Sequence, residues 1–220
     1  MIKTAFQTLL RDETFGSRVD LTWLNISERY VYHDSQYKSP KMARRELGFH
    51  DEVKILAYVS HLTRSVPGDF LEIGVWKGKS LALIREFCDP EKRVIGIDPL
   101  IVPGQFDDFL YFHDAILKGV DFIHGFSEQG LSKVLGITNK LCAIHIDGGH
   151  LFNNVLTDFV LYDRLLSSGG IIVFDDYNDS LNSPEVKLAV DYLTRWFTGS
   201  DYEILGTLNK FPNPFVIVKR

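Results

Sequence analysis

The segment that most constrains this chain is a glycine turn between an apolar strand and a helix. Residues 66 to 80 read Val-Pro-Gly-Asp-Phe-Leu-Glu-Ile-Gly-Val-Trp-Lys-Gly-Lys-Ser. Gly74 and Gly78 let the backbone approach a ligand closely, and the first amides of the helix that begins near Lys79 face the same place. The turn therefore predicts a pocket of the kind that binds nucleotides.

The spacing of the turn separates three classes of ligand. A dinucleotide fingerprint needs glycine where this chain has the bulky Trp76. A Walker A loop needs four residues between its glycines, whereas three separate Gly74 from Gly78. A turn for S-adenosylmethionine cradles no phosphate, and Glu72 can face the ammonium and sulfonium charges of that ligand. We therefore expect S-adenosylmethionine at Glu72, Gly74, Trp76, Gly78 and Ser80.

A second acid, Asp98, ends the next apolar run. It lies about twenty residues after Gly78, the spacing at which a carboxylate accepts hydrogen bonds from both hydroxyls of a ribose. Taken alone, Asp98 is about as typical of a turn cap before Pro99. Together with the glycine turn, it predicts an adenosine site.

Three more aspartates follow two later apolar runs, with Asp147 after one and Asp175 and Asp176 after the other. Ligands of open α/β sheets bind beyond the carboxyl ends of the strands, so we expect these carboxylates to meet. They would repel one another unless a divalent cation lay between them, and Mg²⁺ prefers such oxygen ligands. An isolated Asp-Asp pair more often caps a turn, but the matching Asp147 favours a metal site.

These segments resemble the macrocin O-methyltransferase family within the class I methyltransferases. The likeness is carried by Val-Pro-Gly-Asp-x-x-Glu-x-Gly-Val-Trp-x-Gly, by Asp147-Gly-Gly-His150 and by Ser168-Gly-Gly-Ile-Ile-Val-Phe-Asp-Asp-Tyr177. It spans about residues 50 to 220. It implies that the three aspartates bind the metal and that a histidine at position 150 is the catalytic base, as in some members. Ser127 would contact the adenine, although a helix N-cap is an equally good interpretation.

The chain departs from the family at Gly149, because many relatives carry an acid directly after Asp-Gly. The base is therefore His150, Asp147 itself or a residue from a lid. A sugar or phenol hydroxyl is a poor nucleophile until it is at least partly deprotonated, and Mg²⁺ together with a base of suitable pKa would supply this. His145 lies inside a predicted strand and is expected to pack in the core.

The predicted function is methyl transfer from S-adenosylmethionine to a hydroxyl group of a small molecule of the sugar, phenol or polyketide type, in natural-product biosynthesis. One alternative is a P-loop-like ATP-dependent phosphotransferase or hydrolase, in which residues 171 to 176 would be a Walker B strand and Lys79 the phosphate lysine. Another is a non-catalytic interaction protein that binds the cofactor without turnover. The intact set of three aspartates favours the enzyme.

Apolar runs alternate with helical segments along the chain, which is typical of a doubly wound parallel sheet. The predicted strands are Phe70 to Ile73, Val94 to Ile97, Val120 to His124, Cys142 to Ile146 and Ile171 to Phe174. The predicted helices are Ser80 to Phe87, Gln129 to Leu135, Phe152 to Leu166 and Glu185 to Phe197. With a final antiparallel hairpin at residues 202 to 218, the resemblance implies a Rossmann-like sheet of seven strands.

The chain is expected to hold one methyltransferase domain at residues 51–220, preceded by a helical or cap extension at residues 1–50. The extension carries the aromatic segment Tyr30 to Tyr37, which favours packing over a substrate-facing cap. Pro99 to His113 is a second candidate lid, because it follows the ribose acid and mixes acids with aromatic residues.

Composition excludes several partners. The net charge of −5 and the pI near 5.8 provide no basic field for nucleic acid. No apolar stretch approaches the length that spans a bilayer, and the N-terminus lacks a signal-peptide pattern, so we expect a cytoplasmic protein without a membrane partner. Cys88 and Cys142 have no metal spacing and are expected to be buried thiols. Family members often self-associate, but no heptad pattern fixes an oligomeric state.

Overall fold

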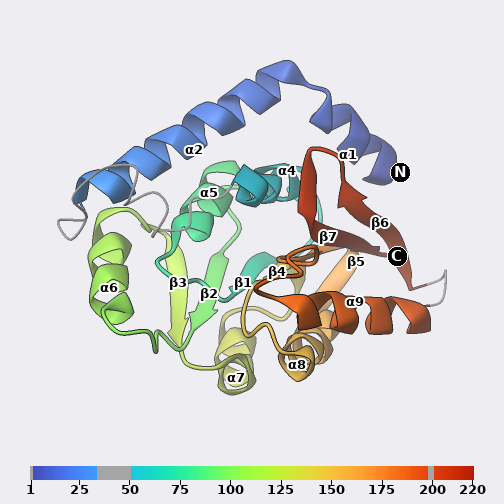
Figure 1. Cartoon of the computed structure of the whole chain (residues 1–220). Helices are drawn as coiled ribbons and strands as arrows, with labels where there is room; N and C mark the ends of the chain where they lie inside the picture. Colours follow the sequence, from blue (N-terminus) through green and yellow to red (C-terminus); the bar gives the residue numbers. More distant parts are fainter. Residues whose placement is uncertain (1, 34–50, 198–200) are drawn as a thin grey trace.

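The computed structural model describes residues 2–33, 51–197 and 201–220, and it contains one sheet of seven strands (Figure 1). The strand order is β3-β2-β1-β4-β5-β7-β6. The first five strands run parallel, and β7 is antiparallel to both β5 and β6. The strands are β1 (Asp69–Ile73), β2 (Val94–Asp98), β3 (Val120–His124), β4 (Leu141–Ile146), β5 (Leu166–Phe174), β6 (Tyr202–Leu208) and β7 (Phe211–Lys219). The predicted α/β fold with its final antiparallel hairpin is confirmed.

Helices cover both faces of the sheet, so the central strands are mostly apolar on both sides, with Glu72 on β1 and His145 on β4 as buried polar exceptions (Figure 1). One face carries α1 (Ile2–Leu10), α2 (Glu13–His33), the short 3₁₀ helix η1 (Asp51–Lys54), α4 (Ile55–Leu62) and α5 (Lys79–Phe87). The other carries α7 (Ser127–Ile137), α8 (Phe152–Tyr162) and α9 (Pro184–Trp196). The helix α6 (Gln105–Ala115) lies beside β3, and a 3₁₀ turn, η2 (Asp163–Leu165), leads into β5. Each face thus has its own hydrophobic core.

The predicted helix from Phe152 to Leu166 is too long at its end. Helix α8 stops at Tyr162, and β5 already begins at Leu166, five residues before the predicted strand. Residues 167–170 are Ser-Ser-Gly-Gly, and Gly169 has a φ of 81°. Glycine tolerates this left-handed backbone and disfavours helix, so these residues belong to the strand and not to the preceding helix.

The N-terminal helices pack against the sheet domain. Helix α2 contacts α5, and its Tyr30 is fully buried with its ring 4.0 Å from that of Phe112 on α6. This contact agrees with the packing interpretation of the aromatic segment for Tyr30. The side chain of Tyr32 and all of Tyr37 lie outside the described residues, and so does the proposed domain boundary at residue 50.

The second candidate lid, Pro99 to His113, is largely helical. Helix α6 buries Phe109 and Phe112, whereas Ile101 and Val102 in the loop before it are exposed. None of the described helices is both long and apolar enough to cross a membrane.

Candidate functional site

The glycine turn after β1 packs directly against the loop after β4. Gly74 has a φ of 85°, and a Cβ there would lie 1.8 Å from the carbonyl oxygen of Asp147. Gly78 has a φ of 86°, and its Cβ would lie 2.4 Å from a methyl group of Leu117. Both glycines are therefore required by backbone angle and by close contact.

Backbone strain gathers at the same edge of the sheet. The three described residues other than glycine with positive φ are Trp76 (53°), Leu100 (47°) and Asp176 (55°). Each lies just beyond the carboxyl end of a strand. Because such conformations cost free energy and concentrate at functional sites, the strain marks this edge as the candidate site.

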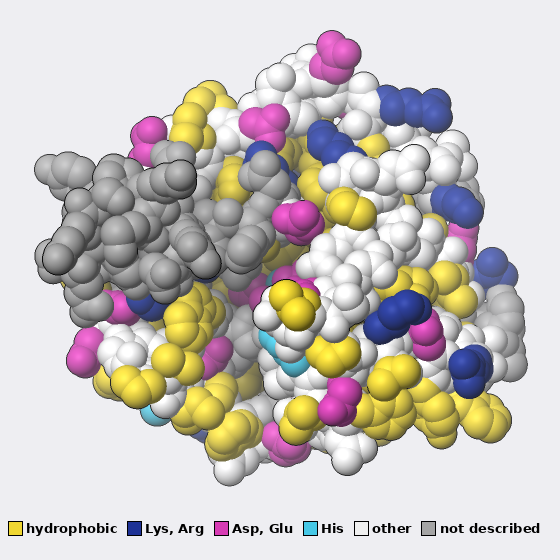
Figure 2. Space-filling model, viewed as in Figure 1, with side chains coloured by type: hydrophobic (Ala, Val, Ile, Leu, Met, Phe, Trp, Pro, Cys, Tyr) yellow, Lys and Arg dark blue, Asp and Glu magenta, His cyan; other side chains and the backbone are white. Residues whose placement is uncertain are grey.

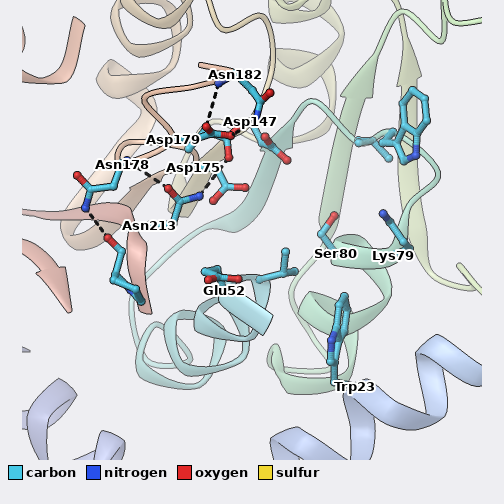
Figure 3. Close-up of a pocket in the computed structure, with 15 residues that line it drawn as sticks. Trp23, Glu52, Lys79, Ser80, Asp147, Asp175, Asn178, Asp179, Asn182 and Asn213 are labelled. Carbon is cyan, nitrogen blue, oxygen red and sulfur yellow. Dashed lines mark hydrogen bonds between the residues drawn. The ribbon is translucent and has the colours of Figure 1, made fainter. Parts of the chain in front are cut away.

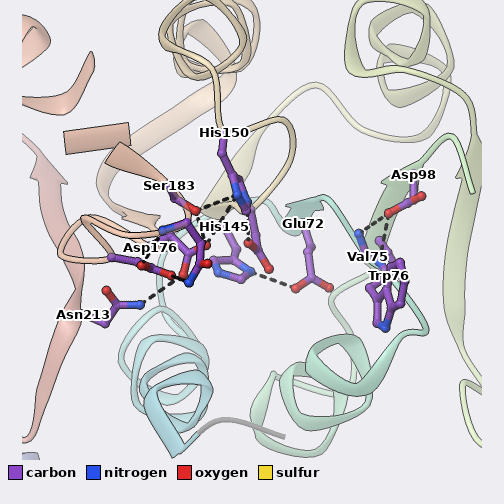
Figure 4. A network of polar contacts seen from close by, with 12 residues as sticks. Glu72, Val75, Trp76, Asp98, His145, His150, Asp176, Ser183 and Asn213 are labelled. Atoms are coloured by element: carbon purple, nitrogen blue, oxygen red, sulfur yellow. Dashed lines mark hydrogen bonds and ion pairs between the residues drawn. The ribbon is translucent and has the colours of Figure 1, made fainter. Parts of the chain in front are cut away.

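Asp98 holds the glycine turn in place (Figure 4). Its Oδ2 atom accepts hydrogen bonds from the amides of Val75 (2.8 Å) and Trp76 (2.9 Å). Its Oδ1 atom accepts from the amide of Leu100 (2.6 Å) and from Nε2 of Gln105 (3.2 Å). A carboxylate accepts about four hydrogen bonds. A ribose at Asp98 would therefore have to share or displace these donors, of which the Gln105 side chain is the movable one.

Two cavities meet at the turn. One has a volume of about 490 Å³ and is called the cofactor-side cavity, because residues predicted from the sequence to bind the cofactor line it. The other has a volume of about 690 Å³ and is called the acceptor-side cavity, because the predicted metal ligands line it. Both are lined by Trp76 and Asp147, and both volumes fall in the usual range of small-molecule sites. Figure 2 shows acidic and histidine side chains at a hollow near the centre of one face.

The cofactor-side cavity brings together most of the predicted cofactor residues. Its lining includes Gly74, Trp76, Asp98, Ser127, Asp147 and His150. Ser80 instead lines the acceptor-side cavity, while Glu72 and Gly78 line neither. Figure 3 shows the acceptor-side cavity, where Lys79 and Trp23 face the carboxylates of Asp147 and Asp175 across the space.

Glu72 lies beneath the turn and is fully buried. Its Oε1 atom is 2.8 Å from Nδ1 of His145, which is itself 2% exposed (Figure 4). Burial lowers the pKa of His145, but the hydrogen bond and the charge of Glu72 outweigh it and raise this pKa to about 9. Burial raises the pKa of Glu72, although the hydrogen bond and the charge of His145 oppose this shift. His145 is therefore a buried hydrogen-bonded partner of Glu72, which is more than the core packing expected of it.

The three aspartates lie in one cluster together with both histidines. His145, Asp147 and Asp175 each place one ligand atom within 4.8 Å of the others, and Asp147, His150 and Asp176 do the same. Burial and the negative charge of Asp147 raise the pKa of Asp175 to about 7. The carboxylates crowd together as the sequence predicts, and the cluster favours a proton or a cation among them.

His150 is held at the edge of this cluster (Figure 4). Its Nδ1 atom is 2.8 Å from Oγ of Ser183, which in turn donates to Oδ2 of Asp176 at 2.9 Å. Its Nε2 atom is 3.7 Å from Oδ1 of Asp147. The neighbouring carboxylate of Asp147 is the main cause that raises the pKa of His150 above its ordinary value. The ring is 40% exposed and can exchange protons with solvent or a ligand.

The departure at Gly149 has a steric reason. A Cβ at this position would lie 2.0 Å from Nδ2 of Asn154 on α8. An acid at this position would therefore require the side chain of Asn154 to move.

Several site residues were not predicted from the sequence, and Lys79 was considered only as the phosphate lysine of the P-loop alternative. Lys79 is 7% exposed in the acceptor-side cavity, and burial lowers its pKa to about 7. Asp158 on α8 is 3% exposed and accepts a hydrogen bond from the hydroxyl of Ser127. The acid at position 158 interrupts the apolar face of Val155, Phe159 and Tyr162, and this was the available signal. No pattern in the sequence around Trp23 or Asn213 indicated that these residues line a cavity.

Comparison with known proteins supports the assignment of the fold. Residues 71–177 match a protein family described as "Methyltransferase domain". An uncharacterised protein of Acanthamoeba polyphaga mimivirus is 29% identical over 200 residues, which cover 85% of this chain and 86% of that protein.

Among solved structures, the chain is similar to the O-methyltransferase from Bacillus cereus in complex with SAH. That match has 18% identity, a TM-score of 0.59 and coverage of 88% of this chain and 96% of the other. The match to the O-methyltransferase NovP has 18% identity and a TM-score of 0.63, and it covers 93% of this chain and 98% of that chain. At these identities the likeness establishes the class I methyltransferase fold.

Proposed function

We propose that this protein is an S-adenosylmethionine-dependent and Mg²⁺-dependent O-methyltransferase that acts on a small hydroxylated molecule. The observation that carries the proposal is the meeting of two cavities at Asp147. One cavity contains the glycine turn and Asp98, and the other contains the aspartate cluster. The match of residues 71–177 to a methyltransferase domain and the O-methyltransferase neighbours support it.

The cofactor fits the residues that line its cavity. S-adenosylmethionine would supply an electrophilic methyl group on a positively charged sulfur. Asp147 faces both cavities and can attract the ammonium group of the cofactor. Asp98 orients the turn itself through the amides of Val75 and Trp76.

The metal fits the acidic cluster. Asp147, Asp175 and Asp176 offer the hard oxygen ligands that Mg²⁺ prefers. When bound, the metal would lower the pKa of an acceptor hydroxyl and fix its direction. Asn213 donates to Oδ1 of Asp176 at 3.1 Å and thereby orients that carboxylate.

The acceptor-side cavity favours a polar substrate. Its lining combines the carboxamides of Asn178, Asn182 and Asn213 with the indole of Trp23. Carboxamides exchange hydrogen bonds with hydroxyl groups, and an aromatic face covers the apolar side of a sugar ring. Among the acceptor classes, we therefore favour a sugar, as in natural-product biosynthesis, and we place the enzyme in the cytoplasm.

The first experiment is calorimetric titration of the purified protein with S-adenosylhomocysteine and with ATP, each with and without Mg²⁺. We expect micromolar binding of S-adenosylhomocysteine, because the cofactor-side cavity matches an adenosine with an amino-acid tail. ATP should not bind measurably, because the turn is one residue too short to cradle a β-phosphate. Tight Mg²⁺-dependent binding of ATP instead would replace this proposal with a phosphotransferase.

His150 is the proposed catalytic base. In His150→Ala we expect kcat to fall by about 10²-fold or more, since positioned bases contribute about 10² to 10⁴. The affinity for S-adenosylhomocysteine should change less than threefold. A variant rate within twofold of wild type from pH 6 to 9 would remove His150 as the base.

A further inference from the structure

The cofactor-side cavity contains a buried carboxyl group to which the proposed reaction gives no role. Asp158, on α8, is 3% exposed and lines this cavity. Its Oδ1 atom accepts the hydrogen bond from Ser127, whereas Oδ2 accepts none from any described residue. The Oδ2 atom lies beside Gly148, whose missing Cβ would be 3.1 Å away. Glycine thus leaves this oxygen open at the cavity wall.

The position of Asp158 in the cavity indicates which part of a ligand it faces. Methyl transfer must take place where the two cavities meet, at Trp76 and Asp147. Asp98 is bonded to the amide of Trp76 and so marks the neighbouring, ribose part. The rest of the lining comes from the loop after β2, which includes Ile101 and Val102, from the loop after β4, and from the start of α7 and from α8, where Phe126, Ser127 and Asp158 lie. We place the purine base of an adenosine at the start of α7 and beside α8, where a polar side chain lies within the cavity wall.

We propose that Oδ2 of Asp158 accepts a hydrogen bond from the exocyclic amino group of adenine and thereby selects adenine over purines with a carbonyl oxygen at that position. This inference rests on the proposed function. A carboxylate only accepts hydrogen bonds, so an amino group satisfies it, while a carbonyl oxygen would face it lone pair to lone pair. Because no described residue donates a hydrogen bond to Oδ2, the amino group of the ligand would supply that donor.

Neighbouring groups hold Asp158 ready for this role. The hydroxyl of Ser127 donates to Oδ1, and the hydroxyl of Tyr162 donates to the carbonyl oxygen of Ser127 at 2.6 Å. Burial raises the pKa of Asp158 to about 6, so the group is still ionised at neutral pH. Ser127 is in this view a positioning residue for Asp158, which differs from both roles predicted for it from the sequence.

The test compares the binding of S-adenosylhomocysteine with that of S-inosylhomocysteine, in which a carbonyl oxygen replaces the amino group. Calorimetry at pH 7.5 on the whole chain should show that the wild type prefers S-adenosylhomocysteine by at least tenfold. In Asp158→Asn, whose amide can donate to a carbonyl oxygen, the preference should fall below twofold or reverse. A variant that weakens both ligands equally and keeps the wild-type preference would overturn the proposal.

Two further variants complete the test. Glu128 is an exposed carboxylate that lines the same cavity. If Glu128→Gln removes the preference and Asp158→Asn does not, Glu128 holds the amino group and the proposal is wrong. If Asp158→Asn does not fold, Ser127→Ala decides: we expect a preference at least threefold smaller, and an unchanged one overturns the proposal. A wild type that binds neither ligand overturns the proposed function itself.

Discussion

Replacing Asp175 with asparagine is expected to lower kcat by about 10³-fold while the affinity for S-adenosylhomocysteine changes less than threefold. A bound divalent ion is worth several kcal/mol of charge stabilisation in a transition state, and each 1.36 kcal/mol is about tenfold in rate. Asp175 lies within the cluster of Asp147 and His145 and lines only the acceptor-side cavity. The loss should therefore appear in turnover. Steady-state kinetics with excess Mg²⁺ and calorimetry measure the two quantities.

The matched control for this variant is Asp121→Asn. Asp121 pairs with Arg93 at 2.7 Å on the surface, in a strand that contributes no carboxylate to the cluster. We expect wild-type kinetics from it, because exposed ion pairs contribute little to stability. Removal of divalent ions with a chelator should reproduce the loss seen in Asp175→Asn, and added Mg²⁺ should restore the wild type alone. Full wild-type turnover in the chelator would refute the metal role.

Breaking the buried pair of Glu72 and His145 is expected to cost about 3 to 5 kcal/mol in the free energy of unfolding, because one charge is left buried without its partner. The two side chains are 0% and 2% exposed and 2.8 Å apart. Glu72→Leu and His145→Leu should each show this loss in urea denaturation with a chelator at pH 7. The double variant should lose less than the sum of the single losses, because it leaves neither charge alone. Additive losses would show that the two residues do not interact.

The pH dependence provides an independent check of the same pair. Folding raises the pKa of His145 from 6.5 to about 9. The contribution of His145 to the free energy of unfolding is therefore fully present below about pH 6.5 and is lost as the pH rises through 9. The stability difference between wild type and His145→Leu should shrink over that interval. Comparing the two proteins removes the slopes of other titrating groups, such as Lys79.

The strand and helix pattern of the sheet domain could be predicted from the residues because each element satisfies a local rule. Parallel strands that are covered on both faces are mostly apolar, and the positive φ angles at positions 74 and 78 favour glycine. The convergence of Asp147, Asp175 and Asp176 followed from the rule that parallel strands end at the same edge. The end of α8 was misjudged because hydrophobic spacing continues past Tyr162 into the turn.

Partners of individual site residues could not be predicted in the same way. Glu72 was expected to face the ligand, yet its partner is His145, which is 73 residues away and lies on the neighbouring strand. Asp98 was expected to hold a ribose, and the structure gives its oxygens to four protein donors. Each of these outcomes depends on distances between side chains of different elements. Sequence spacing sets the strand ends but leaves such distances open.

The sequence by itself determined the class of fold and the convergence of Asp147, Asp175 and Asp176 at the carboxyl edge of the sheet. These follow from local backbone preferences and from the period of apolar residues, which act over a few neighbours. Only the tertiary structure decided that Asp147 faces two cavities and that Asp158 reaches Ser127 from another helix. Burial and hydrogen-bond partners are set by the packing of distant segments, and packing is a property of the folded chain as a whole.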